Sequence, residues 1–197
     1  MKFILGQKIG MSQMFDKDGK LTPVTLVSAG PCYVLQKKTK DKDGYEALQL
    51  GYEKIEKKSK VKKTMKGKEY RYIREIRDYK SELQNGSEVS VSEFAEGDMV
   101  KVSGISKGKG FQGGVKRHGF SGRNATHGVK HEHRTIGSTG SRFPQHVMKG
   151  RKMPGRMGSD RTSVKNLKIM KIDKDNNLLV IKGAVPGRKG ILLEVKG

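Results

Sequence analysis

Hydrophobic residues alternate with polar ones in short runs along the first part of the chain, and this period of two residues is typical of half-buried β-strands. The runs are KFIL, LTPVTLVSAG, CYVLQKK and YEALQLGY, all within residues 1–52. Turn signals separate them, at Asp18-Gly19, Gly30-Pro31 and Asp43-Gly44. The pattern predicts an antiparallel, barrel-like sheet.

The strand pattern is interrupted once and then returns. Residues 53–68, EKIEKKSKVKKTMKGK, are crowded with lysine and have few apolar anchors, which predicts an exposed insertion with at most one weak helix. Residues 70–77, YRYIREIR, and residues 98–106, DMVKVSGIS, again show the strand pattern. We therefore assign residues 1–106 to the first part of a β-barrel domain.

The pattern changes completely after residue 106. In residues 107–162 glycine is dense, large aliphatic residues are scarce, and the only acidic residues are Glu132 and Asp160. A segment of this kind cannot form a core of its own, and we expect it to be largely irregular. Strands resume in residues 163–197, as VKNLKIMKID, LLVIKGAV and ILLEVK. A long loop therefore interrupts a β-barrel domain, and loops of this length are usually functional.

The composition of the chain indicates the class of partner that it binds. Only 33% of the 197 residues are apolar and tryptophan is absent, so one core cannot include the whole chain. Lysine and arginine number 42 against 20 aspartates and glutamates, a formal net charge of +22. A domain with this charge repels itself in isolation, and a polyanionic partner is the simplest explanation. Nucleic acid is the first candidate and an anionic membrane surface is the second.

The chain carries one cysteine, Cys32, which excludes an internal disulfide framework and a cysteine-rich zinc site and agrees with a reducing compartment. The apolar run in MKFILGQKIG is too short for a signal peptide, and no run approaches the roughly 20 apolar residues of a membrane span. We therefore expect a soluble, cytoplasmic protein that has no membrane partner.

A glycine motif raises the possibility of an enzyme. Gly108, Gly110 and Gly113 form a G-x-G-x-x-G, as in nucleotide-binding loops. A dinucleotide site needs a helix after the third glycine, and residues 114–128, GVKRHGFSGRNATHG, are predicted not to sustain one. The chain also lacks the Asp-Phe-Gly of protein kinases and a Walker A loop. A nucleotide-dependent RNA-modifying or phosphotransfer enzyme using residues 108–115 is thus the second hypothesis, and a DNA-architectural protein is the third.

The five histidines, all within residues 107–162, invite a metal hypothesis. No cysteine and almost no carboxylate accompanies them, and neighbouring lysines and arginines would oppose a cation. Glu132 and Asp160 show no sign of forming a catalytic pair. We therefore predict no metal site, no catalytic residue and no cofactor.

The loop is instead suited to phosphates and unpaired bases. Glycine lets backbones approach closely, arginine offers a planar fork to phosphate, and Phe111, Phe120, Phe143 and the histidines can stack on bases. The chain has no helix-turn-helix, zinc-finger, basic-zipper or RNP pattern, and a non-periodic loop suits folded RNA better than a duplex groove. The candidate RNA-binding residues are Lys107, Lys109, Lys116, Arg117, Arg123, His127, His133, Arg134, Arg142, Phe143, Lys149, Arg151, Lys152, Arg156 and Arg161.

Six stretches of the sequence, taken as a set, are more specific than any single motif. They are GQKIGMSQMF (residues 6–15), SKGKGFQGGVKR (106–117), ATHG (125–128), HRTIGSTG (133–140), VMKGRKMPGRMG (147–158) and NLLVIKGAVPG (177–187). In this order, and over nearly the whole chain, they resemble the universal third protein of the large ribosomal subunit in its bacterial form. The resemblance implies a ribosomal protein without catalytic activity.

The resemblance also implies details of fold and partners. It implies a six-stranded, translation-factor-like antiparallel β-barrel, mostly β, with a long basic extension that runs through large-subunit ribosomal RNA toward the peptidyl transferase region. It implies a part in nucleating subunit assembly, and contacts with neighbouring large-subunit proteins, the fourteenth and nineteenth in particular. No small-molecule substrate is implied.

Transferred by position, SKGKGFQGGVKR opens the extension, residues 150–158 lie on its return limb, and residues 140–145 form its tip. Two positions depart from the family. Ile136 stands where the family commonly has proline, and Ser141-Arg142-Phe143 occupies the place where some bacterial members carry a methylated glutamine. That methylation is therefore not expected in this chain.

Overall fold

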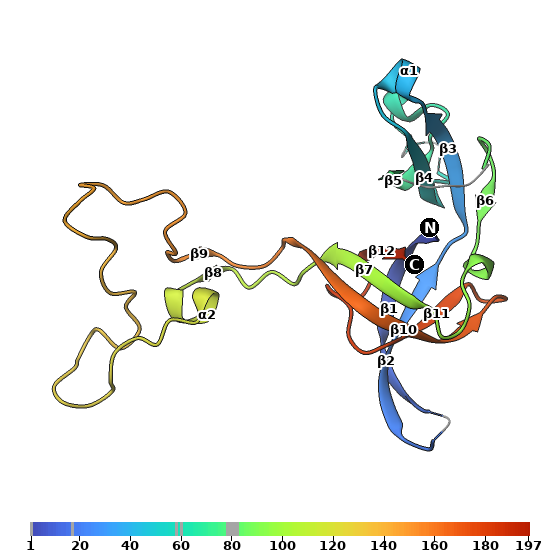
Figure 1. Ribbon diagram of the computed structural model, residues 1–197. Helices are drawn as coiled ribbons and strands as arrows, with labels where there is room; N and C mark the ends of the chain where they lie inside the picture. The colour runs from blue at the N-terminus through green and yellow to red at the C-terminus, as the bar shows by residue number, and fades with distance from the viewer. Residues whose placement is uncertain (1, 17, 58, 60, 78–82) are drawn as a thin grey trace. The chain divides into compact units, whose positions relative to one another are not determined.

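The computed structural model describes residues 2–16, 18–57, 59, 61–77 and 83–197 (Figure 1). The chain divides into two compact units. Met1–Ile105 together with Arg161–Gly197 form one, which we call the β unit. Ser106–Asp160 form the other, which we call the basic unit. Each unit is described separately below.

Six antiparallel strands of the β unit close into a ring (Figure 1). Their order is β1-β12-β7-β10-β11-β2, and the ring closes because β1 pairs with both β12 and β2. The strands are β1 (Phe3–Phe15), β2 (Leu21–Ala29), β7 (Met99–Ile105), β10 (Arg161–Asp173), β11 (Leu178–Lys182) and β12 (Leu192–Lys196). The prediction of a mostly β protein is confirmed.

In these strands the apolar positions of the alternating pattern are the buried ones. In β12, Leu193 and Val195 are buried while their neighbours remain partly exposed, and β2 and β7 show the same alternation. Side chains from successive strands therefore meet in one core, in which residues such as Phe3 and Ile181 are completely buried. Burial of a large aliphatic or aromatic side chain contributes about 1.5–3 kcal/mol, and this core supplies the stability of the unit.

A second antiparallel sheet belongs to the same unit, with the strand order β5-β4-β3-β6. Its strands are β3 (Cys32–Lys38), β4 (Ala47–Lys54), β5 (Tyr70–Arg77) and β6 (Glu88–Val89). Two of the early runs, CYVLQKK and YEALQLGY, thus form β3 and β4 outside the ring, so the prediction that residues 1–52 form one barrel-like sheet was wrong in this respect. Alternation identifies a strand, but it does not identify the strand with which it pairs.

The short elements of the β unit connect these strands. Helix α1 (Lys40–Asp43) joins β3 to β4 and ends at Gly44 in the left-handed conformation. The 3-10 helix η3 (Val91–Glu93) begins after Ser90, whose side chain accepts a hydrogen bond from the Ser92 amide. Within the lysine-rich insertion, Glu53 and Lys54 end β4 and Lys63–Met65 form the single-turn 3-10 helix η2, while residues 58 and 60 lie outside the described residues.

The basic unit contains little regular structure. It consists of β8 (Phe111–Gln112), α2 (Gly114–His118), β9 (Gly155–Arg156) and irregular chain, and Gly114 is its one buried residue. The prediction that no helix follows Gly113 was wrong, because α2 begins there. Gly119, at a φ of 75°, ends the helix after five residues. A left-handed residue satisfies the last helical carbonyls and stops further propagation.

Candidate nucleic-acid interface

Two antiparallel limbs of backbone form the base of the basic unit. The Ser106 amide donates to the Asp160 carbonyl, and the Lys109 amide donates to the Met157 carbonyl, both at 2.9 Å. The Met157 amide in turn donates to the Gly110 carbonyl at 2.9 Å, and β8 pairs with β9 further along. Backbone hydrogen bonds thus tie the two limbs together.

The glycines of the G-x-G-x-x-G serve this pairing. A Cβ atom at Gly108 would lie 2.8 Å from the Ser159 hydroxyl oxygen, and Gly110 has a φ of 69°. Gly113 is the N-cap residue of α2. A five-residue helix has too few aligned peptide dipoles and free amides to form a dinucleotide cradle. The motif therefore has a structural role in this protein, in a close approach and a turn.

A small apolar contact anchors α2. A Cβ atom at Gly114 would lie 2.5 Å from the Ile136 Cγ2 atom and 2.8 Å from the Phe120 ring, so glycine is needed for this packing. The His118 and Phe120 rings are tilted by 37°, with centroids 5.9 Å apart. Phe120 is half-buried in this contact, and the hypothesis that it stacks on an RNA base is not supported by its position.

Arg117 and His118 connect α2 to the returning limb. The Arg117 guanidinium donates to the Met153 carbonyl at 2.7 Å, and the His118 Nε2 atom lies 3.1 Å from the same oxygen. Gly155 makes room for the guanidinium, because a Cβ atom there would lie 2.7 Å from Arg117 Nη1. Arg117, predicted to bind RNA, is thus also a cross-link inside the basic unit.

Three further predicted arginines also have partners within the unit. Arg123 forms an ion pair with Glu132, and both side chains are more than half exposed. Arg151 donates to the Ser138 carbonyl, and the Arg142 guanidinium lies 6.0 Å from the centroid of the Phe143 ring. Exposed contacts of this kind contribute little stability, so these arginines can exchange them for phosphates at small cost.

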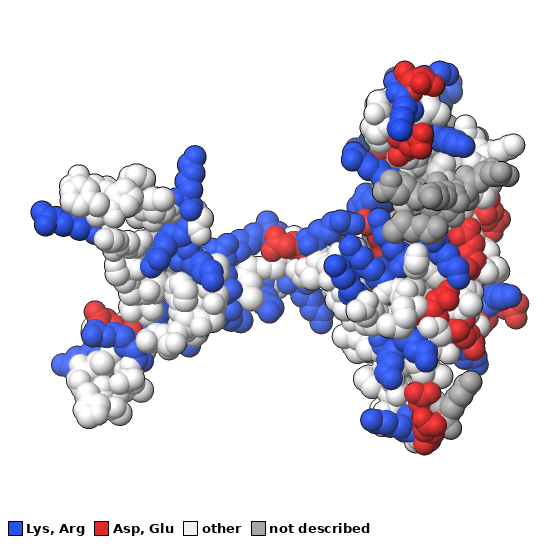
Figure 2. Space-filling view, viewed as in Figure 1, with Lys and Arg blue, Asp and Glu red and all other residues white. Residues whose placement is uncertain are grey.

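The remaining predicted cations of the basic unit project from its surface. Their side chains are exposed, and within the described part of the chain no hydrogen bond or ion pair holds them: Lys107, Lys109, Lys116, Arg134, Lys149, Lys152 and Arg156. Figure 2 shows lysine and arginine distributed over this unit with few acidic side chains between them. This arrangement of unneutralised charge can bind a flexible polyanion along its length.

Exposed apolar side chains accompany these cations. Phe143 is 68% exposed, and Phe111 is 77% exposed in β8. Of the two predicted histidines, His127 is exposed at a φ of 57°, whereas His133 is half-buried and its carbonyl accepts from the Arg123 amide at 3.1 Å. The sequence had indicated Phe111 as an aromatic residue able to stack on bases, but it was left out of the list of candidate RNA-binding residues.

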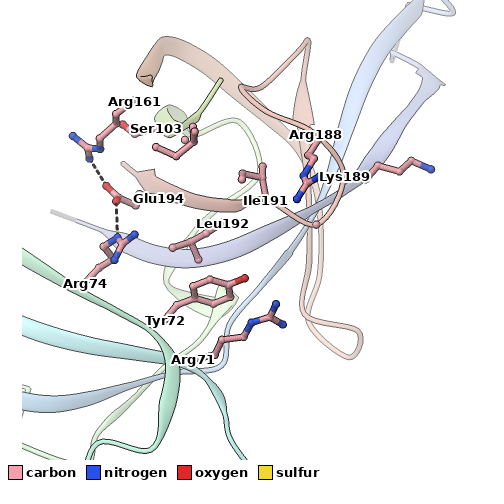
Figure 3. A pocket seen from close by; sticks show the side chains of 13 residues that line it. Arg71, Tyr72, Arg74, Ser103, Arg161, Arg188, Lys189, Ile191, Leu192 and Glu194 are labelled. Atoms are coloured by element: carbon pink, nitrogen blue, oxygen red, sulfur yellow. Dashed lines mark hydrogen bonds and ion pairs between the residues drawn. The ribbon is translucent and has the colours of Figure 1, made fainter. Parts of the chain in front are cut away.

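Arg161 is the one predicted residue that belongs to the β unit. It is the first residue of β10 in the β unit, and it forms an ion pair with Glu194 of β12. There it lines a pocket of about 560 Å³ together with Arg74, Arg188 and Lys189, which sequence reasoning missed (Figure 3). No local pattern could have found this pocket, because its residues come from segments far apart in the chain.

Two observations concern other classes of site. Among the described residues, no group of three or more histidine, cysteine, aspartate or glutamate side chains could hold a metal ion. In the same part of the chain, no helix has the length and apolar character needed to cross a membrane.

Comparison with known proteins shows one consistent relationship. The family model for ribosomal protein L3 matches residues 56–178. The large ribosomal subunit protein uL3 of Carboxydothermus hydrogenoformans is 51% identical over 203 residues, which cover 99% of this chain and 96% of that protein. The proteins of the same name from a Geobacillus species and from Thermosipho africanus are 52% and 45% identical and cover 98% and 100% of this chain. The similarity therefore includes both units.

Proposed function

The chain belongs to the ribosomal protein L3 family, and we propose that it binds large-subunit ribosomal RNA through its basic unit as a structural constituent of the large subunit. This family consists of structural components of the ribosome in the bacterial cytoplasm and not of enzymes. The hypothesis of a nucleotide-dependent enzyme that uses residues 108–115 is therefore set aside.

The observation that carries the proposal is the density of unneutralised charge on the basic unit. This unit holds 12 of the 42 lysines and arginines but only two of the 20 acidic residues, and it buries one glycine. Because the unit has no core, folding alone gives it little favourable free energy to offset the lost conformational entropy. Neutralising its cations against phosphates releases condensed counterions, which supplies the missing free energy.

The shape of the unit favours RNA over duplex DNA. It presents irregular backbone and exposed Phe111 and Phe143 side chains, not a helix that fits a major groove. Folded RNA offers crevices and unpaired bases on which aromatic rings and guanidinium groups stack. The seven unpaired cations and His127 contact phosphates or bases in this proposal, as do Arg123 and Arg151 once they exchange their exposed contacts. Arg117 and the His133 backbone also hold the loop in shape.

Finer features of the proposal follow the family resemblance. The closed six-stranded ring of the β unit is a barrel of the translation-factor kind, and β10 resumes the barrel at Arg161, two residues before the predicted boundary. The basic unit penetrates the RNA toward the peptidyl transferase region, and the protein helps to nucleate subunit assembly. Its neighbours in the subunit include the fourteenth and nineteenth proteins. The chemistry of the loop supports this arrangement, since a largely irregular cationic loop folds best while RNA folds around it.

Binding of the full chain to a large-subunit ribosomal RNA transcript, measured over a series of salt concentrations, tests the proposal. Replacing Lys107, Lys109, Lys149 and Lys152 with glutamine should reduce the slope of log K against log salt by about 0.7–0.9 for each phosphate that is no longer neutralised. The matched control replaces four exposed lysines of the β unit, Lys40, Lys42, Lys66 and Lys174, with glutamine. Equal effects of the two variants would contradict the proposal.

Two further comparisons separate the alternatives. Duplex DNA that binds as tightly as the ribosomal transcript at physiological salt would favour a DNA-architectural protein. Retention of the chain on large subunits after a high-salt wash would distinguish a ribosomal constituent from a loosely bound polycation.

A further inference from the structure

A pocket in the β unit lies between the second sheet and the ring, and Arg161 is the one predicted RNA-binding residue that lines it. It has a volume of about 560 Å³, within the range of sites for small ligands. Its lining comes from β5, from β7, from the start of β10, from the segment that leads into β12 and from β12 itself (Figure 3). Five of its side chains are cationic, namely Arg71, Arg74, Arg161, Arg188 and Lys189, and one is acidic, Glu194.

Glu194 holds two of these arginines in place. Its carboxylate, with 15% of the side chain exposed, lies 3.4 Å from Arg74 Nε and also pairs with Arg161. Figure 3 shows the carboxylate between the two guanidinium groups. One acid shared by two arginines leaves a net positive charge, and it fixes the planar forks that recognise phosphate. The arginines are therefore oriented before any ligand arrives.

The segment that carries Arg188 and Lys189 is fixed by a buried lysine. Lys8, which is 7% exposed, donates from Nζ to the Val185 carbonyl at 3.0 Å and to the Gly187 carbonyl at 3.3 Å. Its backbone carbonyl accepts from the Gly190 amide at 2.7 Å. These bonds hold both sides of the turn on which the two cations lie. The backbone that carries the two cations is thus held in place, so binding does not have to order the turn.

An apolar wall lies between the two cationic ends of the pocket. Tyr72, Ile191 and Leu192 form it, as Figure 3 shows. The Tyr72 ring packs against Tyr52 at a centroid distance of 6.3 Å, and the Arg71 guanidinium lies 5.2 Å from the Tyr72 ring centroid. A phosphate alone gains nothing from such a wall, whereas a nucleobase gains both apolar burial and stacking on the guanidinium plane.

We propose that this pocket binds an unpaired nucleotide of RNA, with its phosphates at the cationic ends and its base against Tyr72, Ile191 and Leu192. The inference rests on the proposed function, because it adds a second contact with the same class of RNA partner. A paired base is excluded since its edges and faces are occupied within the duplex. A free nucleotide shares the same chemistry, and the experiment below separates the two sources.

The test uses the full chain, with Arg188 and Lys189 both replaced by glutamine. Both side chains are exposed, so folding should be unaffected. The matched control replaces Lys174 and Lys182, exposed lysines of the same unit that do not line the pocket. The probes are a labelled oligouridine, a blunt RNA duplex of equal length, and an oligouridine containing 4-thiouridine for photo-crosslinking.

Relative to the control, the pocket variant should bind oligouridine about tenfold more weakly, with a salt slope smaller by about 1.4 because two phosphates are no longer neutralised. The two variants should bind the duplex equally. Crosslinks in the unsubstituted chain should map to β5 or to the segment before β12, and they should disappear in the pocket variant.

Three results overturn the inference. If both variants bind oligouridine with equal affinity, the pocket does not bind a nucleotide. If the pocket variant loses as much affinity for the duplex as for oligouridine, its cations attract RNA only through general electrostatics. Displacement of the crosslink by ATP, at concentrations where inorganic triphosphate has no effect, assigns the pocket to a free nucleotide. In each case the unsubstituted chain still binds ribosomal RNA, whereas failure of that chain to bind any RNA contradicts the proposed function itself.

Discussion

Gly158 lies against the backbone of Lys107 so closely that no other residue fits. Its φ is 78°, and a Cβ atom there would lie 2.2 Å from the Lys107 carbonyl oxygen. The contact lies between the two hydrogen-bonded limbs at the base of the basic unit. The stability of the loop that carries the proposed RNA-binding residues thus depends on a glycine that contacts no ligand.

Replacing Gly158 with alanine should therefore open the limbs locally. A strained φ and a clash with backbone together cost about 1–3 kcal/mol. Hydrogen exchange should show the amides of Lys109 and Met157, which bond across the limbs, exchanging about five- to a hundredfold faster. Gly140→Ala is the control, because a Cβ atom at Gly140 meets nothing within 4 Å. Equal exchange in the two variants would show that the limbs do not depend on this approach.

The cross-link between Arg117 and the Met153 carbonyl predicts a second effect. Arg117→Gln removes a charge-assisted hydrogen bond of 2.7 Å, which contributes about 1.5–3 kcal/mol in a partly buried setting. Chymotrypsin should cleave after Phe120 faster in this variant, because cleavage follows the population of the open form. Arg156→Gln is the control with the same loss of charge, since that side chain is exposed. Cleavage at the same rate in both variants would refute the cross-link.

The predicted tip of the loop should be dispensable for folding. Arg142 and Phe143 are exposed, and Phe143 retains 68% of its surface. Replacing both with alanine should leave the thermal unfolding of the β unit unchanged, since exposed substitutions alter stability by about 0.5 kcal/mol or less. Reconstituted subunits should nevertheless translate more slowly or respond differently to antibiotics. A lower unfolding temperature would place these residues in a core and contradict the topology.

Acid should weaken the β unit in part through Asp98. The Lys2 ammonium and the Ala95 amide hold the pKa of Asp98 below its ordinary value of 3.8. A carboxyl whose pKa is lowered by folding contributes stability above its unfolded pKa, and that contribution is lost as the pH falls through the folded value. Asp98→Asn should therefore lower the unfolding temperature at neutral pH, and the difference should shrink below about pH 4. Asp18→Asn, at an exposed turn, is the control, and an equal loss of unfolding temperature in both variants would contradict a contribution from the Asp98 contacts.

The single cysteine should be unreactive in the folded protein. Cys32 is completely buried, and burial raises the pKa of its thiol to about 12. Because the thiolate is the nucleophile, a disulfide reagent at pH 8 should react only as fast as the β unit opens. Addition of denaturant should restore the rate of a free thiol. Fast reaction without denaturant would contradict the burial of Cys32.

Much of the architecture was predictable because it depends on local chemistry. Alternation in LLEVK corresponds to β12, YRYIREIR corresponds to β5, and the cationic loop stands out by composition alone. The side-chain period of a strand and the absence of apolar residues are properties of a short window, so neighbours in sequence are sufficient to reveal them.

Only the tertiary structure decided which strands pair and which charges meet. It placed β3 and β4 outside the ring, and it brought Arg74, Arg161 and Glu194 together from β5, β10 and β12. It also engaged Arg117 with a carbonyl on the opposite limb, a role that its charge did not predict. Strand pairing, shared ion pairs and pockets depend on contacts between distant segments, and no period or composition within one segment encodes its partner.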